Sequence, residues 1–132
     1  MTQGIEQAAA MRNAFDAIEE AYEFMLAYAA QGRKRESAEA SSESQIRHYL
    51  KRFAAALDDL ETAADAGLGG AEGEAFVGRF LSDIAVMRSV IRLLMAQPSI
   101  SSDMVDNTNG LVAVRAFLTD IFFIDQAVLP PR

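Results

Sequence analysis

Residues 8–29 read AAAMRNAFDAIEEAYEFMLAYA, and this stretch decides the fold class. Its apolar side chains recur at steps of three and four, which is the period of one face of an α-helix. The acidic residues Asp16, Glu19, Glu20 and Glu23 lie mostly off that face. The pattern therefore predicts an amphipathic helix over about residues 5–31, and Gly32 follows it as a natural C-cap.

The same period returns three more times along the chain. It predicts helices over about residues 43–66, 74–97 and 102–129. Their expected core positions are Ile46, Leu50, Phe53, Leu57, Leu60, Ala64, then Val77, Phe80, Ile84, Met87, Ile91, Leu94, and finally Val114, Phe117, Ile121, Ile124, Val128. No stretch alternates with a period of two for long enough to form a strand. The fold expected for residues 1–132 is therefore a single all-α domain, an up-down-up-down antiparallel four-helix bundle.

Local signals set the expected ends of these helices. Ser42 and Gln45 have the spacing of a capping box at the start of the second helix. Residues 67–73 contain four glycines and are expected not to be helical. Pro98 ends the third helix, and Ser101 or Ser102 can cap the fourth. The weak helix formers of residues 107–110 make Gly110 a candidate break.

Composition excludes several classes of function. Among 132 residues there is no cysteine and one histidine, which excludes disulfide frameworks, thiolate metal sites and multi-histidine metal centres. The net charge of −7 argues against a nucleic acid or an anionic membrane as partner. The N-terminus lacks the pattern of a signal peptide, and charges interrupt the apolar stretch 110–129, so we expect a cytoplasmic protein. No cofactor is predicted.

The last two predicted helices carry more apolar residues than one buried face needs. A helix with apolar residues on more than one face is either central or covered by another chain. We therefore predict a homodimer formed through these helices, and symmetric dimers are also the commonest oligomers. The expected interface residues are Val86, Val90, Leu93, Leu111, Leu118, Phe122 and Phe123. Ordinary burial with scattered apolar surface residues is the alternative interpretation. Arg79, Arg88 and Arg92 of the third helix are expected to pair with the acidic first helix or with the second subunit.

His48 is the first candidate for chemistry. It lies off the apolar seam of its helix, in the string His48-Tyr49-Leu50-Lys51. This string resembles the H-x-L-K core of histidine-phosphotransfer domains, which are small acidic four-helix bundles with one exposed histidine. The resemblance implies that His48 accepts a phosphoryl group and that Lys51, one turn later, steadies the added charge. A surface histidine without a special role is the alternative.

Glu19, Glu20 and Glu23 are the second candidate. Their E-E-x-x-E string resembles the first metal-binding motif of the all-helical MazG-like nucleotide pyrophosphohydrolases. The resemblance implies a magnesium site, because carboxylates spaced by three and four residues face one way and Mg²⁺ prefers oxygen ligands. A solvated or arginine-paired acidic face is the alternative.

Neither motif comes with a complete catalytic set. The sequence therefore favours a non-enzymatic, adaptor-like interaction or regulatory protein, with homodimerisation and another protein as the expected partners. Histidine phosphotransfer through His48 is the first alternative. A small-ligand-binding bundle, lined by phenylalanine and methionine from the third and fourth helices, is the second.

Overall fold

The computed structural model describes residues 2–37 and 44–131, and every regular element within them is helical. The elements are α1 (Thr2–Ala29), α2 (Gln45–Asp65), α3 (Gly70–Met95), α4 (Ser102–Asn109), α5 (Val112–Phe123) and a π-helical turn, η1 (Ile124–Val128). The all-helical prediction is confirmed. None of these helices combines the length and the apolar character needed to cross a membrane.

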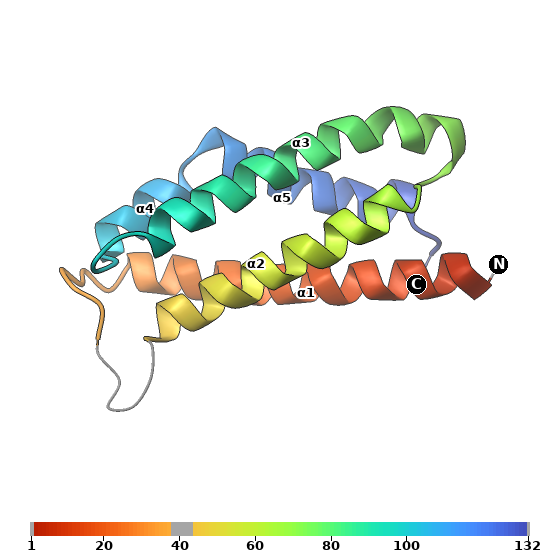
Figure 1. Ribbon diagram of the computed structural model, residues 1–132. Coiled ribbons are helices and arrows are strands. Elements are labelled where there is room, and N and C mark those ends of the chain that lie inside the picture. Colours follow the sequence, from red (N-terminus) through yellow and green to blue (C-terminus); the bar gives the residue numbers. More distant parts are fainter. Residues whose placement is uncertain (1, 38–43, 132) are drawn as a thin grey trace.

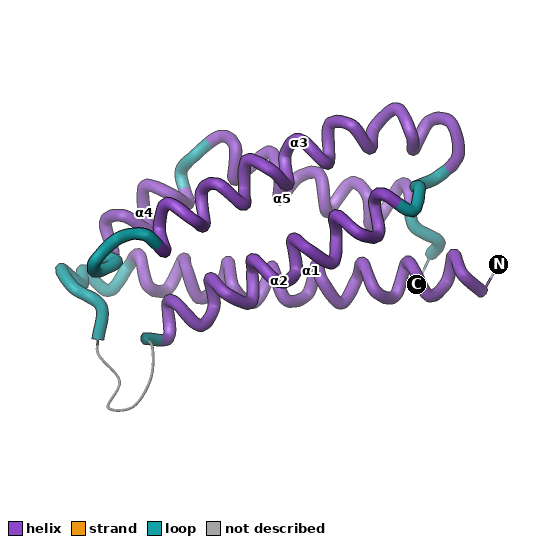
Figure 2. Tube along the Cα trace, viewed as in Figure 1, coloured by secondary structure: helices purple, strands orange, loops and turns teal. Residues whose placement is uncertain are grey.

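Successive long helices run in alternate directions and enclose a shared core (Figures 1 and 2). α1 packs against α2 and α4, and α3 packs against α2 and α5. Phe53, Phe80 and Phe117 meet at the centre, where the Phe80 and Phe117 rings lie parallel with centroids 6.2 Å apart. The expected core positions of the last three helices are buried, except that Val77 and Val128 are half-buried.

The start of α3 differs from the prediction. Helical structure begins at Gly70 and includes Gly73, so the expectation that residues 67–73 are non-helical is wrong from Gly70 onward. The Gly73 amide donates to the Gly69 carbonyl, and Leu68 packs directly over Gly73. A Cβ on Gly73 would lie 1.7 Å from the Leu68 carbonyl oxygen. The glycine is therefore required for close packing at this turn, which outweighs its low helix propensity.

The predicted fourth helix is divided. α4 ends at Asn109, Gly110 caps it, and Leu111 is extended at φ −63° and ψ 135° before α5 begins. The break falls at the glycine expected to weaken the helix, and the Ser101 hydroxyl caps α4 by accepting from the Met104 amide. The capping residue predicted for α2, Ser42, lies outside the described residues.

The end of α1 and the start of α4 complete each other's hydrogen bonds. The Ser102 amide donates to the Arg33 carbonyl at 2.9 Å, and the Arg33 amide donates to the Ser102 hydroxyl oxygen at 2.8 Å. The same hydroxyl donates to the Tyr28 carbonyl at 2.7 Å. Because helix ends leave backbone groups without partners inside the helix, this exchange satisfies groups at both termini.

Candidate functional site

Exposed apolar side chains gather where α3 and α5 lie side by side. Leu93 is 67% exposed and Val112 is 78% exposed, with Val86, Leu111 and Phe123 each about half exposed. We define the α3–α5 face by Phe76, Val86, Val90, Leu93, Leu111, Val112 and Phe123. Among the described residues, the other exposed large apolar side chains are those of Ile5 and Leu26 on α1 and of Phe122 on α5. The surplus noted in the sequence is therefore concentrated on one side of the molecule.

Two residues of the predicted interface lie elsewhere. Leu118 is buried in the core on the same side of α5 as Val114 and Ile121, so its assignment to an interface is corrected. Phe122 is 54% exposed, but one residue along a helix turns a side chain by about 100°, so Phe122 lies beside this face. Val90 is half-buried within the face.

The α3–α5 face is hollowed at both ends. A groove of 570 Å³ lies at the start of α3, where the rings of Phe76 and Phe123 meet edge to face at 5.5 Å. A second groove of 330 Å³ lies at the other end. It is lined by Val90, Leu93, Leu94, Gln97, Met104, Asn107, Thr108 and Leu111. From Phe76 to Leu93 α3 advances about 25 Å, so the two grooves are well separated.

A pair of carboxyl groups lies between the two grooves. The carboxyl groups of Asp83 of α3 and Asp120 of α5 lie close enough for each to act on the pKa of the other. Arg79, one turn before Asp83, donates to the Asp83 carboxylate at 2.9 Å. The Asp120 Oδ2 atom is buried, and no donor from another residue reaches it. An ionised carboxylate has no donor, so a hydrogen bond between these two groups forms only when one of them carries a proton.

The environment assigns that proton to Asp120. Burial, the hydrogen bond with Asp83 and the negative charge of Asp83 together raise the pKa of Asp120 to about 7. Burial also acts on Asp83, but the hydrogen bond from Asp120 and the Arg79 guanidinium outweigh it and lower the pKa of Asp83. Arg79 and Asp83 form an ion pair, and near neutral pH Asp120 is close to the midpoint of its titration.

His48 is exposed on α2, as the sequence predicted, and its ring packs edge-on against Tyr49 with centroids 5.5 Å apart. Lys51 is also exposed, one turn further along the helix. These two residues lie on the outer side of α2, and neither lines the grooves of the α3–α5 face.

The three glutamates of the predicted metal motif are exposed on α1. Glu20 pairs with Arg52 of α2 at 2.9 Å, which matches the arginine-paired alternative for that residue. Among the residues that the structure describes, no three histidine, aspartate or glutamate side chains are grouped to hold a metal ion.

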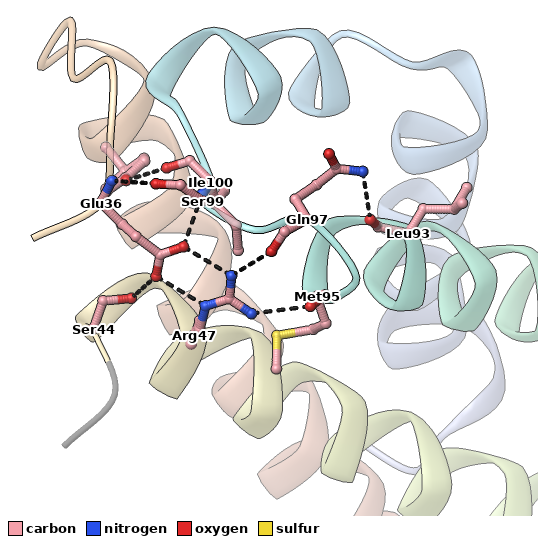
Figure 3. Close-up of polar contacts among 9 residues, drawn as sticks. Glu36, Ser44, Arg47, Leu93, Met95, Gln97, Ser99 and Ile100 are labelled. Atoms are coloured by element: carbon pink, nitrogen blue, oxygen red, sulfur yellow. Dashed lines mark hydrogen bonds and ion pairs between the residues drawn. The ribbon is translucent and has the colours of Figure 1, made fainter. Parts of the chain in front are cut away.

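A second polar cluster, which we call the Glu36–Arg47 clasp, holds the loop after α1 (Figure 3). The Glu36 carboxylate accepts from Nε and Nη2 of Arg47 at 2.9 and 2.8 Å, from the Ser44 hydroxyl and from the Ile100 amide. Arg47 also donates to the Met95 carbonyl at 2.9 Å and the Gln97 carbonyl at 2.7 Å. The clasp thus connects the first loop, the start of α2 and the end of α3.

The sequence did not predict the Asp83–Asp120 pair. Each aspartate lies in a largely apolar stretch and follows a hydroxyl residue, Ser82 or Thr119, so an isolated charge in each apolar stretch is the signal at these positions. Comparison of the chain with protein-family models, curated proteins and solved structures gives no match.

Proposed function

We propose that this is a non-enzymatic interaction protein that acts as a homodimer, with a second copy covering the α3–α5 face. The observation that supports this proposal is the concentration of exposed apolar side chains on that one face of the helical bundle. Large exposed apolar patches on proteins mark interaction surfaces. In this proposal the protein acts by associating with another chain, and that role requires no catalytic residues.

The shape of the face favours a second copy as its occupant. Leu93 and Val112, the most exposed apolar side chains of the face, stand beside the smaller groove at one end, and the 570 Å³ groove opens at the other. A two-fold axis through the middle of the face lays the Leu93 end of each copy over the larger groove of its partner. The same contact then forms twice, as an isologous dimer requires.

The amount of apolar surface also suits a dimer. Weighted by their exposed fractions, the side chains of the face leave roughly 500 Å² of apolar area open. A standard interface buries about 800 Å² per partner, of which a little over half is apolar. The α3–α5 face therefore supplies the apolar part of one ordinary interface.

Replacing Leu93 with glutamate is expected to convert the dimer to a monomer, because the change places a charge at a highly exposed part of the proposed contact. Light scattering of the wild type at about pH 6 should give close to twice 14.4 kDa, and Leu93→Glu under the same conditions should give one chain. Leu26→Glu on α1 is the matched control, since Leu26 is 48% exposed but lies outside the face. A wild-type monomer, or a dimer that survives Leu93→Glu, would contradict the proposed interface.

The 570 Å³ groove supports a second candidate function, the binding of a small apolar ligand. Its volume lies in the range of small-molecule pockets, and apart from Glu72 it is lined by phenylalanines and small residues. Titration with a fluorescent apolar dye tests this candidate. The expected result is binding that Phe76→Ala weakens and Leu26→Glu, outside the groove, leaves unchanged, and the absence of binding would reject it.

A further inference from the structure

We propose that association through the α3–α5 face takes up a proton at Asp120 of each protomer, so that the dimer forms at mildly acidic pH and dissociates as the pH rises. This inference rests on the proposed dimer and concerns the regulation of the same face. The observation that supports it is the position of the Asp83–Asp120 pair between the two grooves.

The pair lies close to the middle of the proposed contact. Asp83 comes seven residues after Phe76 and ten before Leu93, which mark the two ends of the face along α3. A two-fold axis that lays one end over the other therefore passes near Asp83. The dimer brings two carboxyl pairs toward each other and covers both with apolar side chains.

Covering the pair changes the balance between its protonation states. The charged groups that act on Asp120 are Asp83 and Arg79, both from α3, and Arg79 is already engaged with Asp83. An ionised Asp120 thus leaves one uncompensated negative charge in each pair. Removing water from an ionised carboxylate is costly, and a second pair nearby adds repulsion between like charges. The protonated form instead donates to Asp83 and adds no charge to the interface.

The size of the effect follows from linkage between binding and protonation. In the free protein Asp120 has a pKa of about 7, so its protonated fraction falls about tenfold between pH 6 and pH 8. If both protomers must be protonated in the dimer, the dissociation constant rises by the square of that factor. We therefore expect dimerisation to weaken about 100-fold from pH 6 to pH 8.

Sedimentation equilibrium over a concentration series, at about pH 6 and about pH 8, measures this change in the full chain. Asp120→Asn keeps a donor toward Asp83 without a charge, and it is expected to dimerise equally at both pH values. Asp83→Asn removes the neighbouring charge that helps raise the pKa of Asp120, and it should shift the pH midpoint of dissociation downward. Circular dichroism of each variant verifies that the helices are retained.

The possible results distinguish proton uptake at Asp120 from the proposed homodimer on which it rests. A wild-type dimer with the same dissociation constant at both pH values would contradict proton uptake, and so would a pH dependence that is unchanged in Asp120→Asn. Either result would still be compatible with the proposed homodimer. A monomer at both pH values would overturn both. A monomer that binds a basic amphipathic peptide more tightly at about pH 8 than at about pH 6 would also overturn both, because the face would then recognise a cationic helix of another protein.

Discussion

Substitution of Gly73 by alanine is expected to lower the free energy of unfolding by about 3 kcal/mol, the upper end of the range for overpacking. The added Cβ would lie 1.7 Å from the carbonyl oxygen and 2.4 Å from the carbonyl carbon of Leu68. Both are backbone atoms, so no side-chain rotation relieves the contact. The turn between α2 and α3 must move instead, and that displaces Leu68 from the core.

Gly78→Ala is the matched control for this substitution. Gly78 lies in the same helix and is exposed, and a Cβ added there would meet no atom within 4 Å. Alanine at this position should raise stability by about 0.5–1 kcal/mol, because it removes conformational freedom from the unfolded chain without a clash. Urea unfolding of the two variants measures both effects. Equal changes in the two variants would show that the approach of Leu68 to Gly73 does not control stability.

Disruption of the Glu36–Arg47 clasp should have the second largest effect. Glu36→Ala is expected to cost about 2 kcal/mol, because it leaves the Arg47 guanidinium without its carboxylate and the Ile100 amide without its acceptor. Glu23→Ala, at an exposed position of α1, serves as the control and should change stability by less than about 0.5 kcal/mol. Denaturant unfolding of both variants measures these costs.

A double-mutant cycle with Arg47→Met tests whether the clasp acts as a unit. The two single substitutions should not add, since either one removes the shared ion pair, and the coupling should amount to about 1–2 kcal/mol. Additive losses would mean that Glu36 and Arg47 stabilise the protein independently, through the Ile100 amide on one side and the Met95 and Gln97 carbonyls on the other.

The clasp also predicts a pH dependence of stability. Partial burial opposes ionisation of Glu36, but its hydrogen bonds with Arg47, Ser44 and Ile100 outweigh burial and lower the pKa of the carboxyl group. A lowered folded-state pKa gives stability that is present above the ordinary pKa of glutamate and is lost as the pH falls through the folded value. Stability should therefore fall less between neutral pH and about pH 3 in Glu36→Gln than in the wild type.

The sequence predicted features that depend on local pattern. The period of three and four located the core positions of the helices, as Ile18, Leu50 and Ile84 illustrate, because burial of a helix face repeats with the helical turn. Ser101 was one of two candidate caps and Gly110 a candidate break, and both signals depend on a few adjacent residues. The helical start at Gly70 was not predicted, because it depends on the packing of Leu68 over Gly73.

Features that join distant residues could not be predicted from the sequence for the same reason. Asp83 and Asp120 lie 37 positions apart and meet because α3 and α5 pack together. Arg88 was expected to pair with the first helix or with a second subunit, but its partners are Asp58 and Glu61 of α2. A periodic pattern shows which side of a helix is buried, and it does not show which neighbour covers that side.

The hydrogen bonds between Ser102 and the end of α1 have a consequence for synthesis on the ribosome. α1 and α2 can pair as soon as both have emerged, since they are adjacent in the chain and pack extensively. The backbone amide and carbonyl of Arg33, however, find their partners at Ser102, about 70 residues later. The nascent N-terminal hairpin therefore lacks the partners of the Arg33 backbone groups until Ser102 is translated, and the segment after α1 gains these hydrogen bonds only then.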